Sequence, residues 1–120
     1  MTEDAEKFPK ERRRAPRVTG ALVEYSIEGR DVDRRNAFIK DVCIYGICIY
    51  IPETVKSGEV ISLDIILYGD DNAIQAVGKV IWCKPGGYLG YYNVGIEFDE
   101  ISDSHQKILS DYIAANYRGE

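Results

Sequence analysis

The strongest constraint on this chain is an alternation of apolar and polar side chains with a period of two residues. In residues 60–67 the apolar side chains fall on one face: Ile61, Leu63, Ile65 and Leu67. Residues 74–82 and 94–98 repeat the alternation. Because successive side chains of a strand point to opposite faces of a sheet, each of these segments predicts a half-buried β-strand.

Three further segments are short and rich in β-branched and aromatic residues, which also predicts strands: residues 18–25, 37–42 and 47–51. The period changes after Ile101, where apolar residues recur at helical spacing: Ile108, Leu109, Tyr112, Ile113 and Ala115. This spacing predicts a helix over residues 104–117 with Asp103 as its cap. Six strands and one helix predict an all-β fold, either an antiparallel barrel or a sandwich, with the helix covering an open end or edge.

The length of 120 residues allows one domain. No apolar run approaches the ~20 residues of a membrane-spanning helix, so we expect no membrane insertion. The acidic start of the chain, residues 1–6, does not fit a secretory signal. Three cysteines without CxxC spacing argue against a disulfide framework or a metal site and favour a cytoplasmic location: Cys43, Cys48 and Cys83.

Positive charge is concentrated near the N-terminus. Residues 7–17 hold six basic residues and one acid, a net charge of +5, whereas the whole chain carries −5 and the other 109 residues therefore carry −10. A nucleic-acid binder spreads positive charge over a face, so an RNA- or DNA-binding function is disfavoured. Pro9 and Pro16 bracket the arginines and predict an extended segment. We interpret residues 1–11 as a flexible leader.

No residue pattern indicates catalysis. His105 is the only histidine, and a lone surface histidine is usually solvated or part of a helix cap. No P-loop, dinucleotide fingerprint or metal-ligand spacing occurs. We therefore expect a protein that is not an enzyme and that uses neither a metal nor a resident cofactor.

One pair of segments suits a ligand. The arginines lie just before the first predicted strand: Arg12, Arg13, Arg14 and Arg17. Arginine offers a planar fork of donors that fits phosphate oxygens and the O6/N7 edge of guanine. Asp41 can accept hydrogen bonds from the opposite edge of guanine, and Gly46 allows a tight turn and close approach of a flat ligand. The simpler interpretation is a basic leader with Asp41 and Gly46 as turn residues.

The same residues resemble a known family. Residues 13–17, Arg-Arg-Ala-Pro-Arg, fit the Arg-x-x-x-Arg motif of PilZ domains, and residues 41–46, Asp-Val-Cys-Ile-Tyr-Gly, are similar to their second motif, Asp/Asn-x-Ser-x-x-Gly. Residues 78–82 and 95–101 look like later strands of that family. The resemblance implies a six-stranded antiparallel β-barrel of the split-barrel type with a C-terminal α-helix. It also implies non-catalytic binding of the bacterial second messenger cyclic di-GMP.

The resemblance assigns roles residue by residue. Arg13 and Arg17 match the motif arginines, which grip guanine and phosphate, and Arg14 lies between them. Arg12 occupies the flanking position that is linked to binding of one messenger or a stacked pair. Asp41 and Gly46 match the acidic residue and the terminal glycine. The expected domain is residues 12–117, preceded by the leader, which we expect to order on binding, and followed by a tail at 118–120.

Cys43 departs from the motif, which has serine there. A thiol is a weak donor, and losing one neutral hydrogen bond costs on the order of 0.5–1.5 kcal/mol, or about tenfold in affinity at most. Two other interpretations remain: a degenerate adaptor that acts only through protein contacts, or a buried thiol without a ligand role. For an adaptor, Tyr88, Tyr91 and Tyr92 form either a contact surface or hydrophobic cover for the barrel end. A downstream protein partner is expected in either case.

Overall fold

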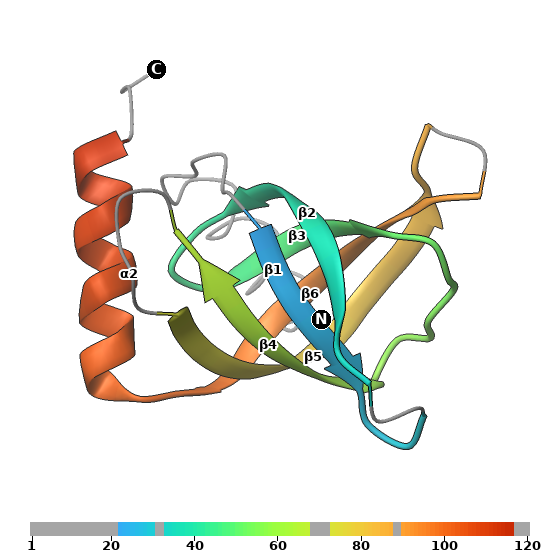
Figure 1. Cartoon of the computed structure of the whole chain (residues 1–120), viewed down its shortest axis with the longest axis horizontal. Helices are drawn as coiled ribbons and strands as arrows, with labels where there is room; N and C mark the ends of the chain where they lie inside the picture. Colours follow the sequence, from blue (N-terminus) through green and yellow to red (C-terminus); the bar gives the residue numbers. More distant parts are fainter. Residues whose placement is uncertain (1–21, 31–32, 68–72, 88–89, 117–120) are drawn as a thin grey trace, which may run out of the picture.

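The computed structural model describes residues 22–30, 33–67, 73–87 and 90–116, which form six strands followed by a helix (Figure 1). The elements are β1 (Leu22–Ile27), β2 (Arg35–Val42), β3 (Gly46–Ile51), β4 (Val60–Ile66), β5 (Ala73–Pro85), β6 (Tyr92–Ile101) and α2 (Asp103–Asn116). No helix in these residues is long and apolar enough to cross a membrane.

The strands close into an antiparallel barrel in the order β1-β2-β3-β6-β5-β4. Pairing of β1 with β4 completes the ring, from Leu22 opposite Ile66 to Ile27 opposite Ile61. Closure removes the free edges that an open sheet of this size would expose. The predicted all-β fold with one C-terminal helix is confirmed, and the barrel rather than the sandwich is the observed architecture.

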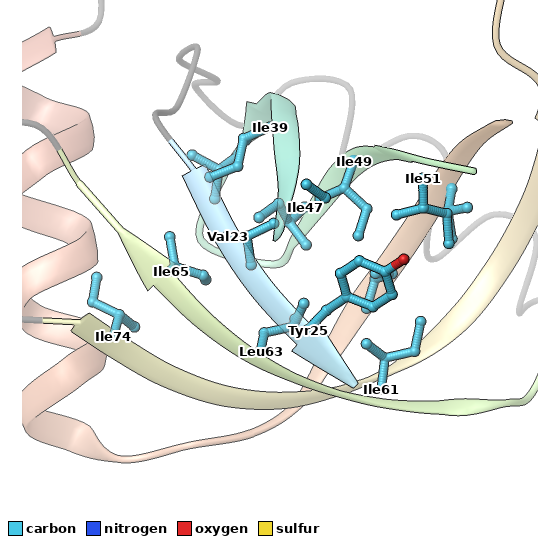
Figure 2. Close-up of a cluster of buried hydrophobic side chains, with 14 of the residues drawn as sticks. Val23, Tyr25, Ile39, Ile47, Ile49, Ile51, Ile61, Leu63, Ile65 and Ile74 are labelled. Atoms are coloured by element: carbon cyan, nitrogen blue, oxygen red, sulfur yellow. The ribbon is translucent and has the colours of Figure 1, made fainter. Parts of the chain in front are cut away.

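The barrel interior is filled by the alternating apolar side chains. Figure 2 shows side chains of β3 pointing toward those of β1 and β4, among them Ile49, Val23 and Leu63, all 0–1% exposed. Burying a side chain of this size stabilises the fold by roughly 1.5–3 kcal/mol. The period-two pattern therefore supplies the core from nearly every strand.

Several element boundaries differ from prediction. β5 continues three residues beyond Trp82, because it forms a long hairpin with β6 that ends at Pro85 opposite Tyr92. The helix cap is Ser102 rather than Asp103, since the Ser102 hydroxyl accepts the His105 N–H at 3.2 Å. The predicted strand residues 18–21, the turn at 70–72 and the last predicted helical residue, 117, lie outside the described residues.

A polar cluster occupies the barrel end where β1 and β3 finish. The Tyr25 hydroxyl donates to Glu53 Oε2 at 2.7 Å, and Arg35 donates to the same oxygen at 2.6 Å. Arg30 joins Glu53 to Glu59, with 2.8 Å between Arg30 Nη2 and Glu59 Oε1. Burial, together with the neighbouring Glu53 carboxylate, raises the pKa of Tyr25. Tyr25 therefore stays a neutral donor that ties the core to the loop after β3.

His105 anchors α2 to the barrel. Its Nδ1 accepts the backbone N–H of Gln75 at 3.1 Å, at the point where β5 has not yet begun to pair with β6. Two side chains on the same helix, Leu109 and Ile113, are buried. The helix lies beside the barrel end where β5 begins (Figure 1).

Replacing His105 with alanine is expected to destabilise the protein by about 1–2 kcal/mol, because the Gln75 N–H loses its acceptor. Urea unfolding of His105→Ala and of Gln106→Ala, an exposed neighbour on the same helix, measures the difference. Equal free energies of unfolding for the two variants would contradict the anchoring role.

Candidate functional site

The second motif forms the hairpin between β2 and β3. The Cys43 N–H donates to the Gly46 carbonyl at 2.9 Å, and the Gly46 N–H returns a bond to the Cys43 carbonyl at 3.3 Å. Ile44 and Tyr45 form the exposed tip between them. Cys43 is only 1% exposed, which fits a buried thiol. The structure thus places Asp41, Cys43 and Gly46 together in one hairpin.

Gly46 is not required by the turn. The described glycines with positive φ are Gly29, Gly58, Gly87 and Gly90, and no described non-glycine residue has a positive φ. The expectation that Gly46 provides conformational freedom for a tight turn is therefore wrong. Gly46 begins β3 and faces outward, two residues before Cys48. It therefore leaves a position without a side chain on the outer side of the strand.

Two β-bulges turn the Asp41 and Trp82 side chains to the outside of the barrel. The register of β2 against β3 shifts between Ile39 and Asp41, so Asp41 lies opposite Cys48 on the outer face. The register of β5 against β6 shifts between Val80 and Trp82, so Trp82 lies opposite Gly95. A bulge inserts one residue and reverses the facing of the residues after it. The simple alternation that groups Trp82 with Ile74 and Val80 is wrong for this reason.

These shifts align four residues across four neighbouring strands, and we call this set the outer row: Asp41, Cys48, Gly95 and Trp82. A methyl group on Gly95 would overlap the Trp82 ring, so the ring lies directly over β6. Only Asp41 was predicted as a site residue from the sequence; Cys48, Gly95 and Trp82 were not. A glycine inside a strand pattern signals close approach of another group, and Gly95 offered that signal.

Polar and charged groups border the outer row toward the tip of the β5–β6 hairpin. Lys84 Nζ lies 5.0 Å from the centre of the Trp82 ring, a cation–π contact on the same face. Asn93 lies opposite both Tyr50 and Lys84, and its Oδ1 is buried with no donor. The face therefore offers a flat aromatic ring with a cation beside it, and the Asn93 acceptor lies buried next to them.

Some candidate residues receive no structural test. Arg12, Arg13, Arg14 and Arg17 lie outside the described residues, as does Tyr88. Of the other two tyrosines before the last strand, Tyr91 is 41% exposed and Tyr92 packs against the core opposite Ile51. Tyr92 therefore acts as hydrophobic cover.

A cavity of about 250 Å³ lies at the opposite end of β2 and β3, lined by the Tyr25–Glu53–Arg35 cluster, Arg30 and neighbouring residues. Its arginines are hydrogen-bonded to Glu53 and Glu59, so they already have partners. Because these arginines already bind carboxylates of the chain, we assign the cavity to the polar cluster at this barrel end.

The chain belongs to the PilZ domain family, whose model matches residues 11–115. A comparison with curated protein sequences found no match.

Several solved structures share the fold at low sequence identity. The Bacillus subtilis inhibitor of motility MotI/DgrA aligns with a TM-score of 0.68 and 18% identity over 85% of this chain and 49% of that chain. The PilZ domain of Escherichia coli YcgR, solved with c-di-GMP, aligns with a TM-score of 0.65 and 14% identity over 88% of this chain and 91% of that chain. The PlzA protein of Borreliella burgdorferi, solved in complex with c-di-GMP, aligns with a TM-score of 0.52 and 17% identity over 87% of this chain and 37% of that chain. This chain thus spans about half of MotI/DgrA.

Replacing Gly95 with alanine is expected to displace the Trp82 ring and to destabilise the fold by about 1–3 kcal/mol, because the new methyl group overlaps the indole. Trp82 is the only tryptophan, so intrinsic fluorescence reports its environment. Gly58→Ala, at a φ of +96° with nothing within 4 Å, is the control that adds strain without touching the ring. An unshifted native-state emission spectrum in Gly95→Ala would contradict the stacking over β6.

Proposed function

We propose that this protein is a non-catalytic receptor for cyclic di-GMP in the bacterial cytoplasm. The ligand would be held between the arginine segment, with Arg12, Arg13, Arg14 and Arg17, and the β2–β3 hairpin, with Asp41, Cys43 and Gly46. Residues 12–117 would form the binding domain, with the leader 1–11 ordering on binding and a short tail at 118–120. A downstream protein would then recognise the ordered form.

The observation that carries this proposal is the alignment of Asp41 with Trp82 in the outer row. A purine base can stack on an indole ring, and aromatic stacking contributes about 1–3 kcal/mol per base. Asp41 would accept hydrogen bonds from the donor edge of guanine.

Charge supports the same assignment. A cyclic dinucleotide carries two phosphates, and the described barrel face contributes Lys84 beside the Trp82 ring. The remaining positive charge for two phosphates would come from the arginine segment. Several charged contacts must form together, because fixing the backbone of a segment costs roughly 1–2 kcal/mol of entropy per residue.

Arg13→Ala combined with Arg17→Ala is expected to weaken cyclic di-GMP binding by at least about a hundredfold, because two charge-assisted contacts are lost. Isothermal titration calorimetry measures the affinity. Lys7→Ala combined with Lys10→Ala removes the same charge from the same segment outside the motif, and is expected to change affinity only a few-fold. No heat with the folded wild-type protein, or equal losses for both pairs, would contradict the proposal.

Cys43→Ser restores the family's hydroxyl and is expected to preserve or improve affinity for cyclic di-GMP. Because Cys43 is 1% exposed, the same change is expected to lower the free energy of unfolding by about 1–3 kcal/mol, unless the ligand supplies the hydroxyl's partner. Calorimetry and urea unfolding, without and with ligand, separate the two effects. Abolished binding by folded Cys43→Ser protein would show that this account of the position is wrong.

An adaptor that does not bind the messenger is the second candidate. The specific observation in its favour is Phe38, which is 65% exposed in the middle of β2, opposite the 41% exposed Leu22 on β1. Such a pair could contact a partner protein with or without ligand. The wild-type titration separates the two functions directly.

A further inference from the structure

Glu97 stands out among the outward-facing residues near the motif. It lies on β6 directly opposite Gly46, which has no side chain, and Glu97 itself is partly buried. Its neighbour on β5 is Lys79, but the Lys79 ammonium lies 4.0 Å from Asp99 instead. The Glu97 side chain has no hydrogen bond or ion pair within the described part of the chain.

An unpaired carboxylate is an unexpected group on this face. A ligand with two phosphates repels it, and partial burial weakens its solvation. A carboxylate is favourable there only if the ligand presents donors to it. The donor edge of guanine, with N1–H and the N2 amino group, is such a surface.

Asp41 and Glu97 are spaced to serve two bases. They sit on β2 and β6, on either side of β3, with Asp41 level with Cys48 and Glu97 level with Gly46. Two strand spacings and a shift of two residues separate their Cα atoms by about 12 Å along the surface. A cyclic dinucleotide with two guanines presents two donor edges, one for each carboxylate.

We propose that Glu97 is a specificity-determining residue that accepts hydrogen bonds from the N1–H and N2 amino group of one guanine, while Asp41 serves the other. This inference rests on the proposed function. It assigns base recognition to β6, outside both motifs, at the residue that pairs with Gly46.

The experiment measures whether the effect of changing one side chain depends on one chemical group of the ligand. Wild-type protein and Glu97→Gln are titrated calorimetrically with cyclic di-GMP and with its inosine analogue, which lacks the N2 amino groups. Glu97→Gln keeps the size of the side chain and removes its charge. Glu97→Asp, which keeps the charge but shortens the reach, is titrated in parallel and takes its place if Glu97→Gln does not fold.

The matched control is Glu24→Gln. Glu24 is also a half-buried, outward-facing glutamate that makes no hydrogen bond or ion pair among the described residues, but it lies on β1 between Asn36 and Asp64, away from the outer row. Its substitution is expected to leave both affinities within about twofold of wild type, as expected for a surface change away from the site.

Glu97→Gln is expected to weaken cyclic di-GMP binding about tenfold, because the carboxylate charge that strengthens the hydrogen bonds is removed and one of its two acceptor oxygens becomes a donor. The affinity ratio between cyclic di-GMP and the inosine analogue is expected to be about tenfold smaller than in the wild type, since the amino group no longer donates to a charged carboxylate. Glu97→Asp is expected to give an intermediate ratio.

An unchanged ratio in Glu97→Gln and Glu97→Asp would overturn the inference, even if affinity fell, because the carboxylate would then act on something other than the base. Cyclic di-GMP binding by the wild type alongside that result would leave the proposed function standing. No binding of cyclic di-GMP by the folded wild type would overturn the proposed function and this inference together.

Discussion

Closure of the barrel is the constraint on which the candidate site depends. Once β1 pairs with β4, every strand has two neighbours and its register is fixed on both sides. The inward side chains, such as Ile47 and Ile49 of β3, then determine which residues face out. Gly46 and Cys48 lie on the same outer surface as their neighbours on β6, because the residues that alternate with them along each strand fill the core. Stability and recognition are therefore set by the same alternation.

Bulges modify that alternation at the two places where the outer row needs it. Without the extra residue at position 40, Asp41 would point into an apolar interior, where an unpaired carboxylate is costly. Without the extra residue at position 81, the Trp82 ring would be directed inward and Gly95 would have nothing to accommodate. An acid and an aromatic ring thus share the outer face, a combination suited to a purine with both a stacking surface and a donor edge.

The fold was predicted from the sequence, whereas the site residues named from the sequence remain predictions. The alternation along residues 60–67 and 94–98 located strands, because the side of the sheet to which a side chain points depends on its position in the local sequence. The facing of Trp82 could not be predicted, since a bulge depends on the register of the partner strand. Glu97 was not a candidate, because the role proposed for it depends on its pairing with Gly46, which lies on another strand about fifty residues away in the sequence. The roles of the arginines and of Cys43 remain predictions.

The proposed function requires that cyclic di-GMP lie on the outer face next to the β2–β3 hairpin. Chemical-shift mapping of the ¹⁵N-labelled protein during titration with cyclic di-GMP locates the ligand residue by residue. The largest changes are expected at Asp41–Cys48, at Gly95 and at the Trp82 indole N–H. Changes concentrated at the Tyr25–Glu53 end of the barrel or along α2, with the hairpin unaffected, would contradict it.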